Sequence, residues 1–130
     1  MTETLLLADD EEGIRKVLGI ALADLGYRVI TAADGREAID IIEHGDVSID
    51  LVLTDMMMPV MDGAATSAYL EEHHPRIPII AASGLNSGGD SSAVGMGIAR
   101  FIGKPYTTAA LLTSVSDTLR EHRLPPEGDG

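Results

Sequence analysis

The chain has 130 residues, no cysteine and a net charge of −12, from 21 acidic and 9 basic residues. This length suits one domain with an ordinary hydrophobic core, and the apolar fraction of 45% is typical of globular proteins. The acidic balance argues against binding to a nucleic-acid backbone, which needs a clustered basic face. The absence of cysteine excludes disulfides, cysteine nucleophiles and thiolate metal sites.

Neither the N-terminus nor the rest of the chain carries a membrane signal. Residues 1–4 lack the basic segment and apolar run of a signal peptide, and no apolar stretch approaches the ~20 residues that span a bilayer. We therefore expect a cytoplasmic protein with no membrane partner. The histidines show no zinc-ligand spacing, and we expect His73-His74 to be an exposed helix end.

Short apolar runs alternate with helical patterns five times. The first run, residues 5–8, is continuous, as in a strand buried on both faces, and apolar residues then recur at helical spacing as far as Gly26. The second run is 28–32, after which Asp34 and Glu37 predict a capping box that opens a helix. A third run at 51–54 precedes a helix that we expect to begin near Asp62.

The second half of the chain continues the alternation with a weaker fourth helix. A run at 77–82 is followed by residues 83–99, whose five glycines predict a short and poorly supported helix. The last strand is expected at 100–103 and the last helix around residues 111–119. Residues 1–123 are then the folded domain, and 124–130 a flexible tail or truncated linker.

Strict strand–helix alternation predicts an α/β fold with a parallel sheet and helices on both faces. In such folds the ligand site lies beyond the carboxyl ends of the strands. Polar residues stand at four of these ends: Asp9 and Asp10, Asp55, Ser83, and Lys104. Three converging carboxylates repel one another, and a hard divalent cation such as Mg²⁺ relieves that repulsion.

Each of these residues also has an ordinary structural explanation. Asp10 or Glu12 would serve as a cap of the first helix, and Asp55 as a turn residue. Lys104 would serve equally well as a surface lysine. Their joint placement at four strand ends favours a site that holds a metal ion, with Ser83 and Lys104 as donors to the oxygens of a phosphoryl group.

Short motifs surround the same positions. They are Asp9-Asp10, Met58-Pro59, Met61-Asp62-Gly63, Ser83-Gly84 and Lys104-Pro105, with Phe101 three residues before the lysine. This combination, which runs from about residue 4 to residue 119, resembles the response-regulator receiver family. The resemblance implies a flavodoxin-like (βα)5 fold, a doubly wound five-stranded parallel sheet with strand order 2-1-3-4-5. Residues 2–6 and 82–86 look most like receivers of hybrid sensor histidine kinases.

The resemblance also implies a role for each site residue. Asp55 is the expected phosphoacceptor. Magnesium would be bound by Asp10 directly, by Asp9 through water, and by Asp55 and the carbonyl of Met57. Ser83 and Lys104 would hold the phosphoryl oxygens, Ser83 and Phe101 would form the switch, and the Lys104–Pro105 bond would be cis. Tyr106 departs from the phenylalanine that often follows Lys-Pro in the family.

The expected function is that of a signalling receiver that catalyses only its own phosphorylation and slow dephosphorylation. The phosphoryl donor would be a sensor histidine kinase or a histidine phosphotransfer protein, and the output an altered surface that binds an unknown downstream protein, without nucleic acid. A haloacid-dehalogenase-type phosphatase requires a second aspartate two residues after the nucleophile, where this chain has Met57. A flavodoxin-like electron carrier would not place acids at 9–12, and a degenerate receiver would lack the intact acidic, hydroxyl and lysine set.

Overall fold

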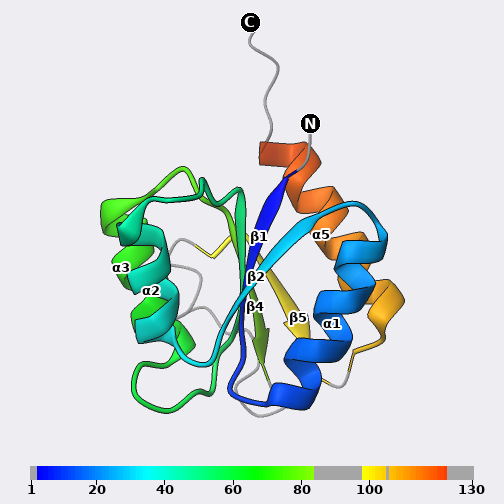
Figure 1. Cartoon of the computed structure of the whole chain (residues 1–130), viewed down its shortest axis with the longest axis horizontal. Helices are drawn as coiled ribbons and strands as arrows, with labels where there is room; N and C mark the ends of the chain where they lie inside the picture. The colour runs from blue at the N-terminus through cyan, green and yellow to red at the C-terminus, as the bar shows by residue number, and fades with distance from the viewer. Residues whose placement is uncertain (1–2, 84–97, 105, 123–130) are drawn as a thin grey trace, which may run out of the picture.

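The computed structural model describes residues 3–83, 98–104 and 106–122, and in them five parallel strands form one sheet. The strands lie in the order β2-β1-β3-β4-β5, which confirms the predicted order (Figure 1). Their bounds are β1 (Thr4–Ala8), β2 (Arg28–Ala32), β3 (Leu51–Asp55), β4 (Ile79–Ser83) and β5 (Arg100–Gly103).

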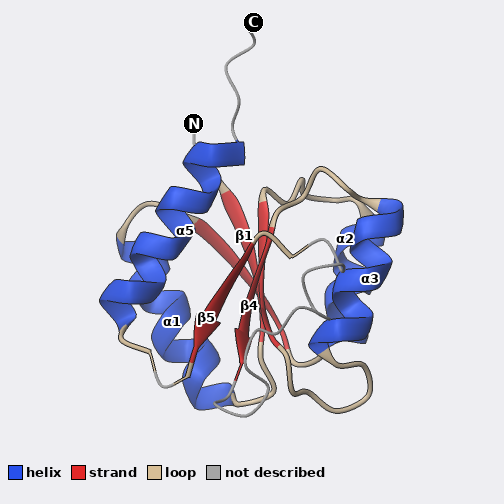
Figure 2. Cartoon of the chain, turned by 180° about the vertical axis from the view of Figure 1, so that it is seen from behind, coloured by secondary structure: helices blue, strands red, loops and turns tan. Residues whose placement is uncertain are grey.

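Helices cover both faces of the sheet. They are α1 (Glu12–Asp24), α2 (Gly35–His44), α3 (Gly63–His73) and α5 (Thr108–His122). Helices α1 and α5 lie on one face and α2 and α3 on the other, as two opposite views show (Figures 1 and 2). The helix expected between residues 83 and 99 and the expected tail at 124–130 fall outside the described residues, apart from the two ends of the first range.

The central strands are buried on both faces, as their continuous apolar runs predicted. Every residue of β1, β3 and β4 is buried. Because successive residues of a strand point to opposite faces, Leu5 and Leu7 pack on the side of α1 and α5, whereas Leu6 packs on the side of α2 and α3. The sheet therefore separates two apolar cores and holds the strand ends in a fixed relative position.

The bounds of three strands differ from the sequence prediction, and β1 begins one residue earlier than predicted, at Thr4. Asp55 is the last residue of β3, because its pairing with β4 continues to Ala82, whose carbonyl also accepts the amide of Met56 at 2.9 Å. Strand β4 begins at Ile79 and not at residue 77, since Pro78 has no amide hydrogen for the ladder. Both site residues, Asp55 and Ser83, thus end a strand and are held by its hydrogen bonds.

Helix ends follow the predicted signals in part. Asp34 caps α2 by accepting the amide of Glu37 at 2.8 Å, while the Glu37 carboxylate reaches back to the amide of Ala33 at 2.6 Å. Helix α3 begins directly after Asp62, near the expected position, and Asp62 caps it by accepting the amide of Ala65 at 2.9 Å. Helix α1 differs: neither Asp10 nor Glu12 caps it, and its N-cap residue, Glu11, makes no side-chain capping bond.

The far ends of α2 and α3 are joined by three polar side chains, which we call the α2–α3 clasp. The hydroxyl of Tyr69 donates to Glu43 Oε2 at 2.5 Å, and His74 Nε2 lies 3.1 Å from the same oxygen. Glu43 stands near the end of α2, and His74 directly follows α3. Because both helices run against the strands, the clasp lies at the edge of the sheet opposite the strand carboxyl ends.

In the part of the chain that the structure describes, no helix is long and apolar enough to cross a bilayer.

Candidate functional site

The strand order brings the predicted polar residues to one edge of the molecule. Strands β1, β3, β4 and β5 are consecutive in the sheet and parallel, so their carboxyl ends meet at the lower edge in Figure 1. Carboxylate oxygens of Asp9, Asp10 and Asp55 all lie within 4.8 Å of one another. We call these three residues the acid cluster.

Asp55 is the best-held member of the acid cluster. It is 6% exposed, and its two carboxylate oxygens have different partners: the amide of Met57 donates to Oδ1 at 3.1 Å and the ammonium of Lys104 to Oδ2 at 2.7 Å. Lys104 is itself placed by its amide, which donates to the carbonyl of Ser83 at 2.8 Å. The end of β4 thereby positions the only cation that contacts Asp55 among the described residues.

The pKa of Lys104 reflects this contact. Partial burial is the largest influence and lowers it, but the hydrogen bond and charge of Asp55, together with the charge of Asp9, outweigh burial and raise the pKa above its ordinary value. Lys104 therefore stays protonated as a donor for anionic oxygens.

Asp9 is buried and lies among like charges. Burial raises the pKa of its carboxyl, and the charges of Asp55 and Asp10 act in the same direction, opposed by the amide of Glu11 and by Lys104. The Glu11 amide donates to Asp9 Oδ1 at 2.9 Å. The single ammonium of Lys104 thus leaves the acid cluster short of positive charge, a shortage that a divalent cation would remove.

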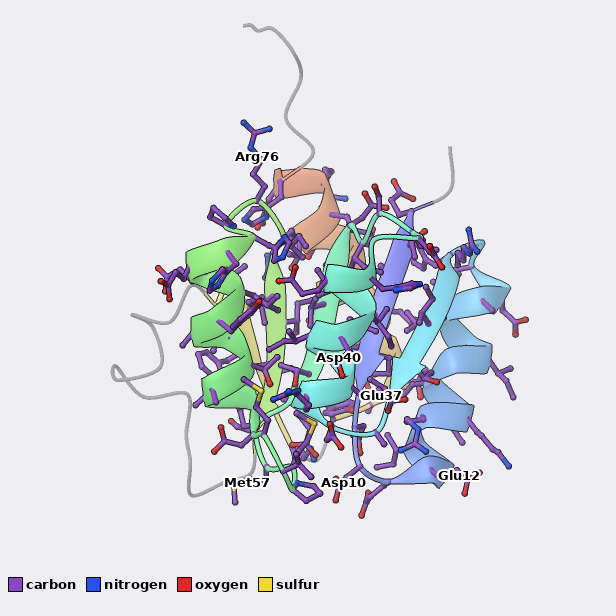
Figure 3. All side chains as sticks on the ribbon, turned by 60° about the vertical axis from the view of Figure 1, so that its left-hand side comes forward. Asp10, Glu12, Glu37, Asp40, Met57 and Arg76 are labelled. Atoms are coloured by element: carbon purple, nitrogen blue, oxygen red, sulfur yellow. The ribbon has the colours of Figure 1, made fainter. Side chains whose placement is uncertain are left out.

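Asp10 is the exposed member of the acid cluster. Among the described residues no hydrogen bond or ion pair reaches its carboxylate, in contrast with Asp9 and Asp55. Figure 3 shows Asp10 and Met57 both at the lower edge of the molecule. The structure thus leaves Asp10 free to take a ligand from solvent.

The loop after Asp55 is fixed by the close approach of two glycines. A Cβ on Gly63 would lie 2.6 Å from both the carbonyl oxygen of Asp55 and Cα of Met56, and a Cβ on Gly35 would lie 1.9 Å from Thr66 Oγ1. Amides of the same glycines donate to this loop: Gly63 to the carbonyl of Met56 at 3.0 Å, Gly35 to that of Met61 at 3.1 Å. The starts of α2 and α3 therefore hold the loop that carries Met57.

The remaining predicted residues lie around this centre. Ser83 is buried at the end of β4, one residue beyond the partner of Asp55. Phe101 lies in β5 beside Ala81 and is half-buried. Met57 is 70% exposed, and its amide, which faces Asp55, keeps the loop close to the acid cluster. Pro105, and with it the expected cis bond, lies outside the described residues.

Two neighbours of the site were not predicted as part of it. Tyr106 packs partly on the core beneath α5, where burial and then the charge of Asp9 raise the pKa of its phenol. Arg15, on the first turns of α1, donates from its guanidinium to the carbonyl oxygen of Asp9 at 2.7 Å. A position directly after Lys-Pro was a signal for Tyr106, but nothing in the spacing of Arg15 pointed to a backbone carbonyl.

Comparison with known proteins gives matches over most of the chain. Residues 5–116 match the family model described as "Response regulator receiver domain". The chain is 35% identical over 118 residues to the transcriptional regulatory protein GlrR of Escherichia coli, covering 90% of this chain and 26% of the relative. It is also 35% identical to the sensor kinase CckA of Brucella abortus, of which it covers 13%.

A solved structure shares the whole fold. The CheY-like response regulator receiver domain protein of Methanospirillum hungatei superposes with a TM-score of 0.87 at 26% identity, over 95% of this chain and 98% of that one. The two curated relatives above are much longer than the stretch they share with this chain, which spans about a quarter of GlrR.

Proposed function

Because the chain belongs to the response regulator receiver family, we propose that it takes a phosphoryl group from a phosphohistidine onto Asp55, with Mg²⁺ bound by the acid cluster. The observation that carries this assignment is the Lys104–Asp55 contact of 2.7 Å beside two further carboxylates. Among the three acids, only Asp55 pairs with a cation in the described residues, so it lies where a transferred phosphoryl group would meet both a metal and an ammonium.

The donor set fits magnesium. Mg²⁺ prefers oxygen ligands, keeps several waters and shares itself with phosphate oxygens, and the acid cluster offers three carboxylates, one of them exposed. Asp10 and Asp55 would bind the ion directly with the carbonyl of Met57, and Asp9 through water. When bound, the ion would supply the positive charge that the acid cluster lacks.

The transfer is a substitution at phosphorus. An oxygen of Asp55 attacks, a new O–P bond forms, and the N–P bond of the donor breaks and leaves a histidine imidazole. The backbone of Lys104 stays in place through the hydrogen bond from its amide to the carbonyl of Ser83. Its ammonium, which donates to the Asp55 carboxylate, would then donate to the phosphoryl oxygens. The Ser83 hydroxyl would take another oxygen, and Phe101, already half-buried, would move further inward as the switch.

The proposed transfer to Asp55 indicates which kind of protein donates the phosphoryl group. A donor that carries phosphohistidine is a sensor histidine kinase or a histidine phosphotransfer protein, and the similarity to the sensor kinase CckA is consistent with that pairing. The name of GlrR describes a transcriptional regulator, a property of a protein about four times as long as the matched segment. The output that we propose for the present chain is an altered protein surface.

The experiment that tests the assignment is phosphorylation with a small donor, such as phosphoramidate, in the presence of Mg²⁺. Wild type should gain one phosphoryl group by intact mass, and Asp55→Asn none, because the amide is not a nucleophile. Asp50→Asn is the matched control: this acid lies at the opposite edge, where it accepts the amide of Thr4 at 2.8 Å, and its variant should be phosphorylated like wild type.

Fold is checked by circular dichroism, which should be unchanged in both variants. One phosphoryl group on Asp55→Asn, at the wild-type rate, would exclude Asp55 as the acceptor.

A further inference from the structure

Arg15 contacts the acid cluster through the backbone and not through a side-chain charge. Its guanidinium donates to the carbonyl oxygen of Asp9 at 2.7 Å, while its own amide donates to the carbonyl of Glu11 at 3.0 Å within the first turn of α1. Arg15 is only partly exposed. Its side chain therefore folds back over the start of the helix to the turn that carries Asp9 and Asp10.

The turn before α1 is held differently from the turns before α2 and α3. Helix α1 begins without a side-chain capping bond at Glu11, whereas α2 and α3 each begin with an aspartate cap. Three contacts hold Asp9 instead: its amide donates to Ala32, its carboxylate accepts the Glu11 amide and its carbonyl accepts Arg15. Of these three, only the bond from Arg15 comes from another side chain.

The carbonyl that Arg15 binds belongs to the peptide unit between Asp9 and Asp10. A peptide unit is planar, so fixing the direction of this carbonyl fixes the plane that ends at Cα of Asp10 and limits where the Asp10 side chain points. Among the described residues no other side chain bonds this carbonyl, and none holds the Asp10 carboxylate itself. Asp9 and Asp55 are placed by their own bonds, whereas Asp10 depends on the backbone before it.

We propose that Arg15 is a positioning residue for the metal-binding half of the site, which it serves by orienting the Asp9–Asp10 peptide toward the ion. The proposal rests on the proposed function, since it takes the acid cluster to be a Mg²⁺ site. Groups that orient the ligands of a metal commonly change its affinity by 10–100-fold when removed. Arg15 acts one step further back, on the backbone, so the lower end of that range, about tenfold, is the expected loss.

The experiment measures Mg²⁺ affinity by isothermal titration calorimetry for wild type, Arg15→Met and Lys16→Met. Lys16→Met removes the same charge from the same turn, but Lys16 is 72% exposed and pairs only with Glu12 at 3.6 Å in the described residues. Arg15→Met should weaken Mg²⁺ binding about tenfold, while Lys16→Met should leave it nearly unchanged. Arg15→Lys, which keeps a donor on a flexible chain, should recover part of the loss.

A second measurement separates positioning from general damage to the fold. In phosphorylation with phosphoramidate, Arg15→Met should need more Mg²⁺ for half-maximal rate and reach close to the wild-type rate at saturation. Titrations are run well below the unfolding temperature of each metal-free variant, so that loss of affinity is not loss of folded protein.

The outcomes distinguish the two proposals. If wild type binds no Mg²⁺, or Asp10→Asn binds it as wild type does, the metal site itself is wrong. If wild type binds Mg²⁺ and Asp10→Asn does not, but Arg15→Met binds as tightly as wild type, the role of Arg15 is overturned. Equal losses in Arg15→Met and Lys16→Met would also overturn it, since they would assign the effect to net charge alone.

Discussion

The acid cluster and the α2–α3 clasp are polar groups at opposite ends of the same molecule, and their carboxylates have different surroundings. In the clasp, Glu43 receives a hydrogen bond from Tyr69 and a second contact from His74. In the acid cluster, Asp9 lies beside two other acids. The hydrogen bond of Tyr69 lowers the pKa of Glu43, followed by that of His74, whereas burial raises the pKa of Asp9. The Glu43 carboxylate thus has its partners within the chain, whereas among the described residues one ammonium, that of Lys104, faces the three carboxylates of the acid cluster.

The largest expected difference between the acid cluster and the clasp is in how variants of each respond to added Mg²⁺. At a concentration 100 times its dissociation constant, an ion that binds only the folded state raises the free energy of unfolding by about 2.7 kcal/mol. We therefore expect the unfolding temperature of wild type to rise by several degrees, and that of Asp10→Asn to stay unchanged. Thermal unfolding across a Mg²⁺ titration measures it. Tyr69→Phe, altered only in the clasp, is the control and should respond to Mg²⁺ like wild type.

Asp9→Asn should make the metal-free protein more stable and not less. The amide keeps the oxygen that accepts the Glu11 amide but removes a buried charge that faces two like charges. A gain of at least about 1 kcal/mol is expected, because two like unit charges about 4 Å apart repel by about that much even in bulk water. Chemical denaturation in the presence of a chelator measures this gain. A clear loss of stability in Asp9→Asn would mean that its charge is already compensated within the chain.

Removing the hydrogen bond of the clasp should have the smallest effect on stability. Unlike Asp9→Asn, it should lower the stability, and the loss should depend on pH. Since the folded-state pKa of Glu43 lies below its ordinary value, the clasp contributes fully above that ordinary value, about 4.3, and loses its contribution as the pH falls through the lowered pKa. Tyr69→Phe should therefore be slightly less stable than wild type at pH 7, and the difference should vanish in acid. Urea unfolding of both proteins from pH 7 to pH 3 measures this. A difference that grows in acid would contradict the role of Tyr69 as a donor to ionised Glu43.

Sequence reasoning predicts the fold well because burial of a parallel sheet leaves a strong local pattern. The runs at 28–32 and 100–103 match β2 and β5 residue for residue, and Asp34 and Asp62 are caps of the helices that they were expected to start. Polar residues at strand ends also predicted which side chains converge, since parallel strands bring their carboxyl ends together. The meeting of Asp9, Asp10 and Asp55 follows from that rule and the strand order.

What the sequence did not predict depends on contacts between distant parts of the chain. The Tyr69–Glu43 bond joins residues 26 positions apart and needs α2 packed against α3. The bond from Arg15 to Asp9 ends on a backbone carbonyl, which every residue carries and which leaves no mark in the sequence. The uncapped start of α1 was likewise hidden, because acids at positions 10–12 look like suitable caps on composition alone.

Gly63 and Gly35 limit which substitutions the chain can tolerate. Neither bears a reactive group, yet a methyl group at either position would collide with backbone or with Thr66 at the foot of the loop after Asp55. In a library of all single substitutions selected only for folding, both positions should accept glycine alone, while the exposed Val60 in the same loop should accept many residues. We therefore expect exposed positions of this loop to vary in sequence. The two glycines should stay constant because a side chain does not fit there, and not because they take part in the chemistry.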